Sequence, residues 1–179
     1  ARAVSRHALG ARGGEIGLDY HCDQSPREQQ QAVFRAQVAL ARELARPIVV
    51  HTREADADTL AILREEGRGD LHGVLHCFTG TKELARAGLD LGFYISLAGI
   101  ITFPKAGELR DIVRAVPVGR LLAETDSPFL APDPHRGKRN EPAWVARVVE
   151  TLAGIHGMEV GDLARQTTTN FHTLFGHSP

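Results

Sequence analysis

Four short apolar segments of the sequence carry side chains that can bind a divalent cation. The segment at residues 14–19 contains an acid within its span, and the other three segments end in a polar residue at the C-terminal tip. Carboxylate and imidazole groups form a mixed oxygen and nitrogen ligand set, which suits zinc, manganese, cobalt or nickel and, with additional water, magnesium. The candidate ligands, in chain order, are Glu15, His51, His76 and Asp126.

Each candidate also has a purely structural explanation. A lone histidine at the end of a strand is more often a satisfied core or loop residue than a ligand, and Asp126 could cap a helix or form an Asx turn. Glu15 is harder to explain by packing, because an unpaired buried carboxylate is costly. Four such residues on four segments therefore favour a shared metal site.

Two further acids are expected beside these ligands. Glu124 lies two residues before Asp126 and so on the same face of its strand, where we expect it to hold a ligand rather than bind the metal. Asp19 shares a face with Glu15 in the same way, and we expect it to orient a ligand or a substrate group. Two cations about 4 Å apart can activate water and stabilise the attacking and leaving oxygens of a phosphoester displacement.

Short apolar strands alternate strictly with amphipathic helices, and this predicts parallel strands joined by helical crossovers. A capping box at residues 25–28 is expected to start one helix, with Val33 on its buried face. In the third strand Val74, His76 and Phe78 are expected to share a face. The expected strands are 13–19, 47–51, 73–78, 93–97 and 121–125; the expected helices are 1–9, 25–45, 55–66, 81–91, 105–115, one ending near 156, and two short ones within 160–175.

A doubly wound sheet and a (β/α)8 barrel compete as the fold. Ligands at the tips of several strands favour the barrel, whose active sites lie at the C-terminal strand ends, and no glycine-rich fingerprint follows the first strand. A barrel needs eight strands, and the sequence provides about five. We therefore expect residues 1–179 to be the C-terminal portion of one α/β TIM-barrel hydrolase domain, with the first strands missing before Ala1.

Composition limits the partners. The formal net charge of −1 gives no long-range attraction to nucleic acid or to an anionic membrane, so any anion must be bound locally. No apolar run approaches the length that spans a bilayer. Two cysteines are too few for a disulfide framework and indicate a reducing compartment, so we expect a cytoplasmic location.

Five stretches carry a family resemblance. They are GEIGLDY at 14–20, IVVHTR at 48–53, GVLHCFTG at 73–80, ETDSP at 124–128 and RGKRNEP at 136–142. In this order and spacing they resemble the motifs of the TatD family, metal-dependent deoxyribonucleases related to the amidohydrolase barrels. The resemblance implies a TIM barrel with two divalent cations, acting as a DNase of the 3′-to-5′ exonuclease type on strand ends, preferably single-stranded.

The same resemblance implies roles for the ligands. Glu15 would bridge the two cations, His51 and His76 would complete the site of one, and Asp126 would serve the other, which makes Glu15 and Asp126 the catalytic carboxylates. Members of the family begin with a strand that bears a His-x-His pair, and this sequence contains none. We therefore expect the 179-residue chain alone to be weakly active or inactive.

Four basic side chains are candidates for holding substrate phosphates. The loop after Asp126 carries Arg136, Lys138 and Arg139, and arginine in particular binds phosphate bidentately. Arg53 follows His51 on the same face, although an ion pair with Glu54 or Asp56 is an alternative explanation.

Two other functions remain open at this point. An amidohydrolase-type enzyme that cleaves C–N or C–O bonds would usually supply a bridging lysine, where this chain has Glu15. A non-catalytic remnant is the third hypothesis, because the His-x-His pair is absent. Hydrolysis of DNA, and its loss when Glu15 or Asp126 is replaced, separates these hypotheses.

Overall fold

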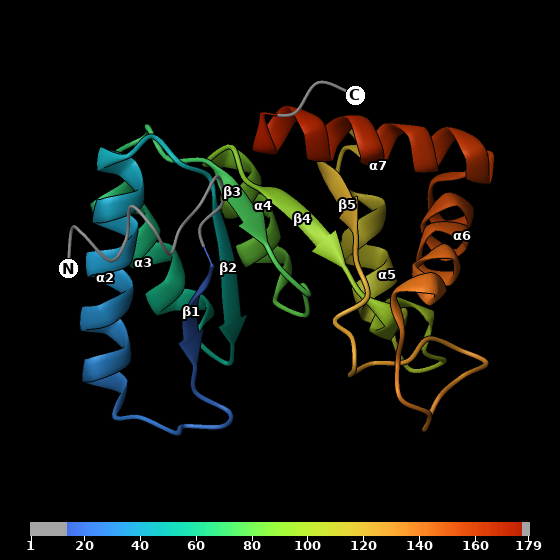
Figure 1. Ribbon diagram of the computed structural model, residues 1–179, viewed down its shortest axis with the longest axis horizontal. Helices are drawn as coiled ribbons and strands as arrows, with labels where there is room; N and C mark the ends of the chain where they lie inside the picture. The colour runs from blue at the N-terminus through green and yellow to red at the C-terminus, as the bar shows by residue number, and fades with distance from the viewer. Residues whose placement is uncertain (1–13, 177–179) are drawn as a thin grey trace.

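The computed structural model describes residues 14–176 (Figure 1). Its five strands form a single parallel sheet in the chain order β1-β2-β3-β4-β5. The strands are β1 (Glu15–Asp19), β2 (Ile48–Arg53), β3 (Gly73–Leu75), β4 (Tyr94–Leu97) and β5 (Leu121–Ala123). The helices are α2 (Arg27–Glu43), α3 (Asp56–Gly67), α4 (Lys82–Asp90), α5 (Gly107–Arg114), α6 (Val145–His156) and α7 (Val160–Phe175), with 3-10 turns η1 (Gly99–Thr102), η2 (Val118–Arg120) and η3 (Pro142–Trp144).

The predicted alternation of strands and helices is confirmed across the described residues. Each pair of neighbouring strands is parallel and is joined by at least one crossover helix. The helix expected at residues 1–9 lies outside the described residues. Between residues 14 and 176, no helix combines the length and the apolar character that crossing a membrane requires.

One face of the sheet is buried by helices. It presents one fully buried aliphatic side chain from each strand, and these pack against apolar residues of α2 to α6 in the main core. The strands appear in the sequence as almost continuous apolar runs where the opposite face is buried as well, as it is at Val74, Tyr94 and Leu122. The five side chains are Leu18, Val50, Leu75, Ile95 and Leu121.

The opposite face is divided into an apolar and a polar half. Near the strand starts, Val74, Tyr94 and Leu122 pack with Leu174 of α7 in a second, smaller core. Helix α7 runs past the strand starts at the top of Figure 1, whereas the arrowheads of β1 and β2 point to the bottom of the view. The strand ends on this face carry the acids and histidines described below.

Two expectations for α2 are wrong. Val33 is 56% exposed, because the buried stripe of the helix is Phe34, Val38 and Ala41, and Val33 lies about 100° away from it. The capping box does not form: Pro26 is the N-cap residue, and no side chain caps the helix. The carbonyl of Ser25 instead accepts a hydrogen bond from the Gln30 side chain.

Phe78 does not share the face of Val74 and His76. Strand β3 ends at Leu75, and Cys77 has a positive φ of 43°, which breaks the alternation of side chains. Phe78 consequently joins the main core, where it is 1% exposed.

The C-terminal segment is one helix and not two. Threonines lower helix propensity, and the hydroxyls of Thr168, Thr169 and Thr173 each donate to the carbonyl four residues earlier, so these side chains are satisfied without leaving the helix. Because α7 contains no proline, and no glycine after Gly161, nothing in its covalent structure ends it before Phe175.

Candidate metal centre

Three of the four predicted ligands form a compact group. One ligand atom each from Glu15, His51 and His76 lies within 4.8 Å of the other two. The distance from Glu15 Oε1 is 3.2 Å to His51 Nδ1 and 3.6 Å to His76 Nε2. Ligands bound to one cation at about 2.0–2.1 Å lie roughly 3.0–3.4 Å apart, so a divalent cation fits this group after small shifts.

The register of the parallel strands brings these side chains together. Gly17 pairs with His51, so Glu15 and Asp19 flank the imidazole from the neighbouring strand. His76 follows directly on β3, and its backbone N–H continues the ladder by donating to the Val50 carbonyl at 2.9 Å. Three adjacent parallel strands therefore deliver three ligands to one face of the sheet, with Glu15 from the first residue of β1 and the two histidines from the later part of β2 and the end of β3.

Glycine is required at position 17. Its φ of 148° lies where other residues are strained, and a Cβ built there would lie 1.8 Å from the carbonyl oxygen of His51. The absence of a side chain lets β1 approach β2 at the point where Glu15 must reach His51.

A carboxylate holds the second nitrogen of each imidazole. Asp19 Oδ2 lies 3.2 Å from His51 Nε2, and Glu124 Oε1 lies 2.7 Å from His76 Nδ1. The Ser96 hydroxyl donates to the other oxygen of Glu124 at 2.5 Å. These contacts orient the rings so that His51 Nδ1 and His76 Nε2 face Glu15, an arrangement typical of histidines that bind metal. The structure thus places Asp19 beside His51 and Glu124 beside His76.

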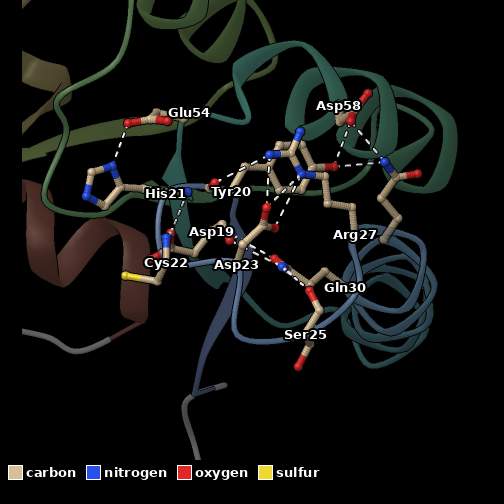
Figure 2. A network of polar contacts seen from close by, with 11 residues as sticks. Asp19, Tyr20, His21, Cys22, Asp23, Ser25, Arg27, Gln30, Glu54 and Asp58 are labelled. Carbon is tan, nitrogen blue, oxygen red and sulfur yellow. Dashed lines mark hydrogen bonds and ion pairs between the residues drawn. The ribbon is translucent and has the colours of Figure 1, made fainter.

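Asp19 is itself fixed by its surroundings, as Figure 2 shows. Its Oδ1 accepts hydrogen bonds from the backbone N–H groups of His21 and Cys22, at 3.0 and 2.8 Å. Gln30 of α2 accepts from the Asp19 N–H and donates to its carbonyl, at 2.9 and 3.2 Å. Sequence reasoning missed Gln30, because nothing distinguishes it from the glutamines on either side of it.

The charges in the group explain the pKa shifts. A hydrogen bond with Glu15 raises the pKa of His51 against the opposing effect of burial, and the same bond lowers the pKa of Glu15. Burial opposes protonation of His76, but Glu124, Glu15 and Asp126 outweigh it and raise its pKa. Four carboxylates surround two imidazoles, so the group carries excess negative charge that a cation can neutralise.

Asp126 lies at the edge of this group. Its Oδ1 is 3.8 Å from His76 Nε2, and it follows β5 in a left-handed conformation with φ of 56°. Burial and the neighbouring charges of Glu124 and Glu15 raise its pKa. The Cys77 thiol points at its Oδ2 from 3.8 Å, and burial together with these carboxylates raises the pKa of that thiol.

Asn140 holds the turn that presents Asp126. It is 4% exposed, and its side-chain amide donates to the carbonyls of Thr125 and Phe129, at 2.7 and 2.6 Å. The expected metal-site residues did not include it, although a single asparagine between a basic run and a proline in the RGKRNEP stretch was a visible signal.

The candidate phosphate-binding residues lie at the end of β2 and in the segment that follows β5, and none of them belongs to the group of metal ligands. The Arg136 guanidinium stacks on the Phe103 ring at 4.2 Å, and Lys138 and Arg139 are exposed. Arg53 is also exposed, and across residues 14–176 it forms no ion pair with Glu54 or Asp56. Glu54 instead contacts His21 at 2.6 Å.

Comparison with known proteins identifies similar chains. A family model described as TatD related DNase matches residues 11–176. The uncharacterized metal-dependent hydrolase YcfH of Escherichia coli (strain K12) is 56% identical over 162 residues, which cover 90% of this chain and 61% of that protein. The 3′-5′ ssDNA/RNA exonuclease TatD of Klebsiella pneumoniae (strain 342) is 40% identical over 168 residues, covering 91% and 64%.

A solved structure shows the same fold. The crystal structure of YJJV, a TatD homologue from Escherichia coli K12, superposes with a TM-score of 0.87 at 30% identity, over 97% of this chain and 69% of that one. The fold class is therefore the α/β barrel type predicted from the sequence, to which the described residues contribute five strands. The chain spans about three fifths of the length of YcfH.

Proposed function

The chain belongs to the family of TatD-related DNases, and we propose that it carries the metal-binding half of a hydrolase that cleaves phosphodiester bonds in DNA. The observation that carries this proposal is the group of Glu15, His51 and His76, with each imidazole held from behind by a carboxylate. A divalent cation bound there would lower the pKa of a coordinated water and polarise a phosphoryl oxygen.

The side chains of this group have separate roles in the proposed function. His51 and His76 would hold the first cation together with Glu15, whose Oε1 faces His51 Nδ1 and His76 Nε2. Asp19 and Glu124 contact the other nitrogen of each ring and so keep the ligand nitrogens aimed at Glu15. Asp126, whose Oδ1 lies 3.8 Å from His76 Nε2, would hold a second cation together with Glu15. Magnesium, manganese and zinc are all compatible with this mixed oxygen and nitrogen ligand set.

Single-stranded DNA ends are the proposed substrate. The Klebsiella pneumoniae relative is named a 3′-5′ ssDNA/RNA exonuclease, and the exposed cations Arg136, Lys138 and Arg139 follow Asp126 on the same loop. Arg53 lies two residues beyond His51 and provides another cation. Local cations on a chain of net charge −1 suit a strand end at the metal centre better than a long duplex.

We propose that the 179-residue chain alone is weakly active or inactive. The second cation has only Asp126 and the shared Glu15 as ligands within this sequence, and the His-x-His pair that family members use is absent from it. A cytoplasmic location and the assignment of the chain to one barrel domain remain proposals as well.

Divalent-dependent release of nucleotides from single-stranded DNA tests the proposal. We expect the complete gene product to release nucleotides, and Glu15→Ala and Asp126→Ala to abolish that release. Asp111→Ala serves as a control, because Asp111 is exposed and, among residues 14–176, forms an ion pair with Arg114 alone. Hydrolysis of amides or lactones without hydrolysis of DNA would instead identify an amidohydrolase-type enzyme, and no hydrolysis at all would favour a non-catalytic role.

A further inference from the structure

Phe129 is an exposed aromatic residue beside the metal centre. Its side chain is 68% exposed, the largest value among the exposed large apolar residues between positions 14 and 176. A single exposed apolar residue is ordinary on a protein surface. Phe129 differs in its position, because its backbone N–H donates to the carbonyl of Asp126 at 2.8 Å and closes the turn that presents this acid.

The backbone that carries Phe129 is held in place. The buried amide of Asn140 donates to the Phe129 carbonyl at 2.6 Å, and the Asn140 N–H donates to the Pro128 carbonyl at 3.0 Å. The ring is thus presented to solvent from a fixed turn, so little conformational freedom is lost when a ligand stacks on it.

Two exposed cations, Lys138 and Arg139, are carried by the backbone beside the turn of Phe129. The hydrogen bond between Asn140 and Pro128 places Arg139, the chain neighbour of Asn140, beside the Phe129 turn, and Lys138 precedes it. Within the described part of the chain, neither Lys138 nor Arg139 forms an ion pair with a carboxylate. Aromatic side chains interleaved with free cations are typical of surfaces that bind single-stranded nucleic acid.

We propose that Phe129 is the stacking platform for a nucleobase of the single-stranded substrate, next to the nucleotide whose phosphodiester is cleaved. Lys138 and Arg139 bind the phosphates on either side of that base. This inference rests on the proposed nuclease function and adds a residue that selects unpaired bases, because a base held in a duplex cannot offer its face to the ring.

The test compares Phe129→Ala, Phe129→Leu and Phe129→Tyr in the complete gene product with manganese. The substrates are short oligothymidylates, each of which lacks one base because an abasic residue stands at a different position from the 3′ end. We expect Phe129→Ala and Phe129→Leu to raise KM for the unmodified strand by roughly 10- to 100-fold, and Phe129→Tyr to keep the wild-type value. For the wild-type protein, we expect an abasic residue at one position to raise KM by the same factor. For Phe129→Ala, an abasic residue at that position should raise KM no further. Val33→Ala, an exposed apolar residue on α2, is the control.

Each outcome decides the question. If wild type cleaves DNA but Phe129→Ala keeps its KM and its sensitivity to every abasic position, stacking is refuted while the nuclease function stands. A lowered melting temperature of Phe129→Ala with an unchanged KM would show that the ring is covered by protein, which also refutes stacking. If wild type cleaves no DNA, both proposals are overturned.

Discussion

The two sides of the candidate metal centre are built differently. On one side, Glu15, His51 and His76 come from three adjacent parallel strands, and a carboxylate fixes the free nitrogen of each imidazole. On the other side, Asp126 stands in a left-handed turn beyond β5, and it approaches His76 only to 3.8 Å. Strand register preassembles the first side, whereas the second side depends on a loop.

This difference has a chemical consequence. A site with three converging ligands can bind a cation without further help, because its geometry exists before the cation arrives. A single carboxylate with a raised pKa binds a cation well only when other ligands are added. We therefore expect the chain to bind one divalent cation by itself, at the side of Glu15.

The largest effect is expected at Glu15. Glu15→Gln removes the charge that faces both histidines, so affinity for the first cation should fall by about 100-fold or more, beyond the roughly 10- to 100-fold that supporting residues contribute. Asp126→Asn should lower that affinity by less than about tenfold, since Asp126 lies outside the three-ligand group. Isothermal titration with manganese measures the affinity of both variants. An equal decrease in affinity in the two variants would contradict the proposed difference between the two sides.

A smaller loss is expected at Glu124. Glu124→Gln replaces the carboxylate that holds His76 Nδ1, and affinity should fall by roughly tenfold, the low end of the usual range, because the amide oxygen still accepts a hydrogen bond. Ser96→Ala should lower the cation affinity by a smaller factor, since it removes only the hydroxyl that donates to Glu124. A wild-type affinity in Glu124→Gln would mean that the ring of His76 needs no such support.

Two buried asparagines provide a matched pair. Asn140 donates to two carbonyls of the Asp126 turn, and Asn170 donates to the carbonyls of Val118 and Leu121, both at 2.8 Å, at the opposite end of β5. Replacing either by alanine leaves two carbonyls without this partner and should cost about 1–3 kcal/mol of unfolding free energy. Only Asn140→Ala should also reduce DNA hydrolysis.

Urea unfolding and nuclease rates on the same protein samples separate these effects. Equal loss of activity in Asn170→Ala would show that stability alone, and not the position of Asp126, controls the rate.

The smallest expected effect is a dependence of the stability of the metal-free protein on pH. The folded-state pKa values of His51 and His76 lie above the ordinary 6.5, so their stabilising contribution is fully present below that pH and is lost as the pH rises through the folded values. Metal needs the unprotonated rings, so cation affinity should rise over the same interval. Unfolding midpoints in EDTA, compared with His51→Gln, measure the first effect; a midpoint that rises with pH in wild type alone would contradict it.

Much of the fold could be predicted from local patterns. The strand at residues 48–51 and the end of α3 near residue 67 depend on neighbours in the sequence, so their positions are predicted within a few residues, although Arg68 and not Gly67 is the left-handed residue that ends the helix. The expectations failed where a side chain or a turn is decided by distant contacts. Val33 is exposed because α2 packs through Phe34, and Phe78 changes face because Cys77 adopts a positive φ.

The sequence by itself determined which residue types stand at the strand ends, and therefore which chemistry is available, because period-two alternation and parallel pairing assign each residue to a face. Only the tertiary structure decided that Glu15 reaches both histidines, that Asp19 and Glu124 hold the rings, and that Asn140 clamps the Asp126 turn. The reason is physical: distances of a few ångströms between side chains far apart in the sequence depend on register, on the close approach at Gly17 and on loop hydrogen bonds, none of which local sequence encodes.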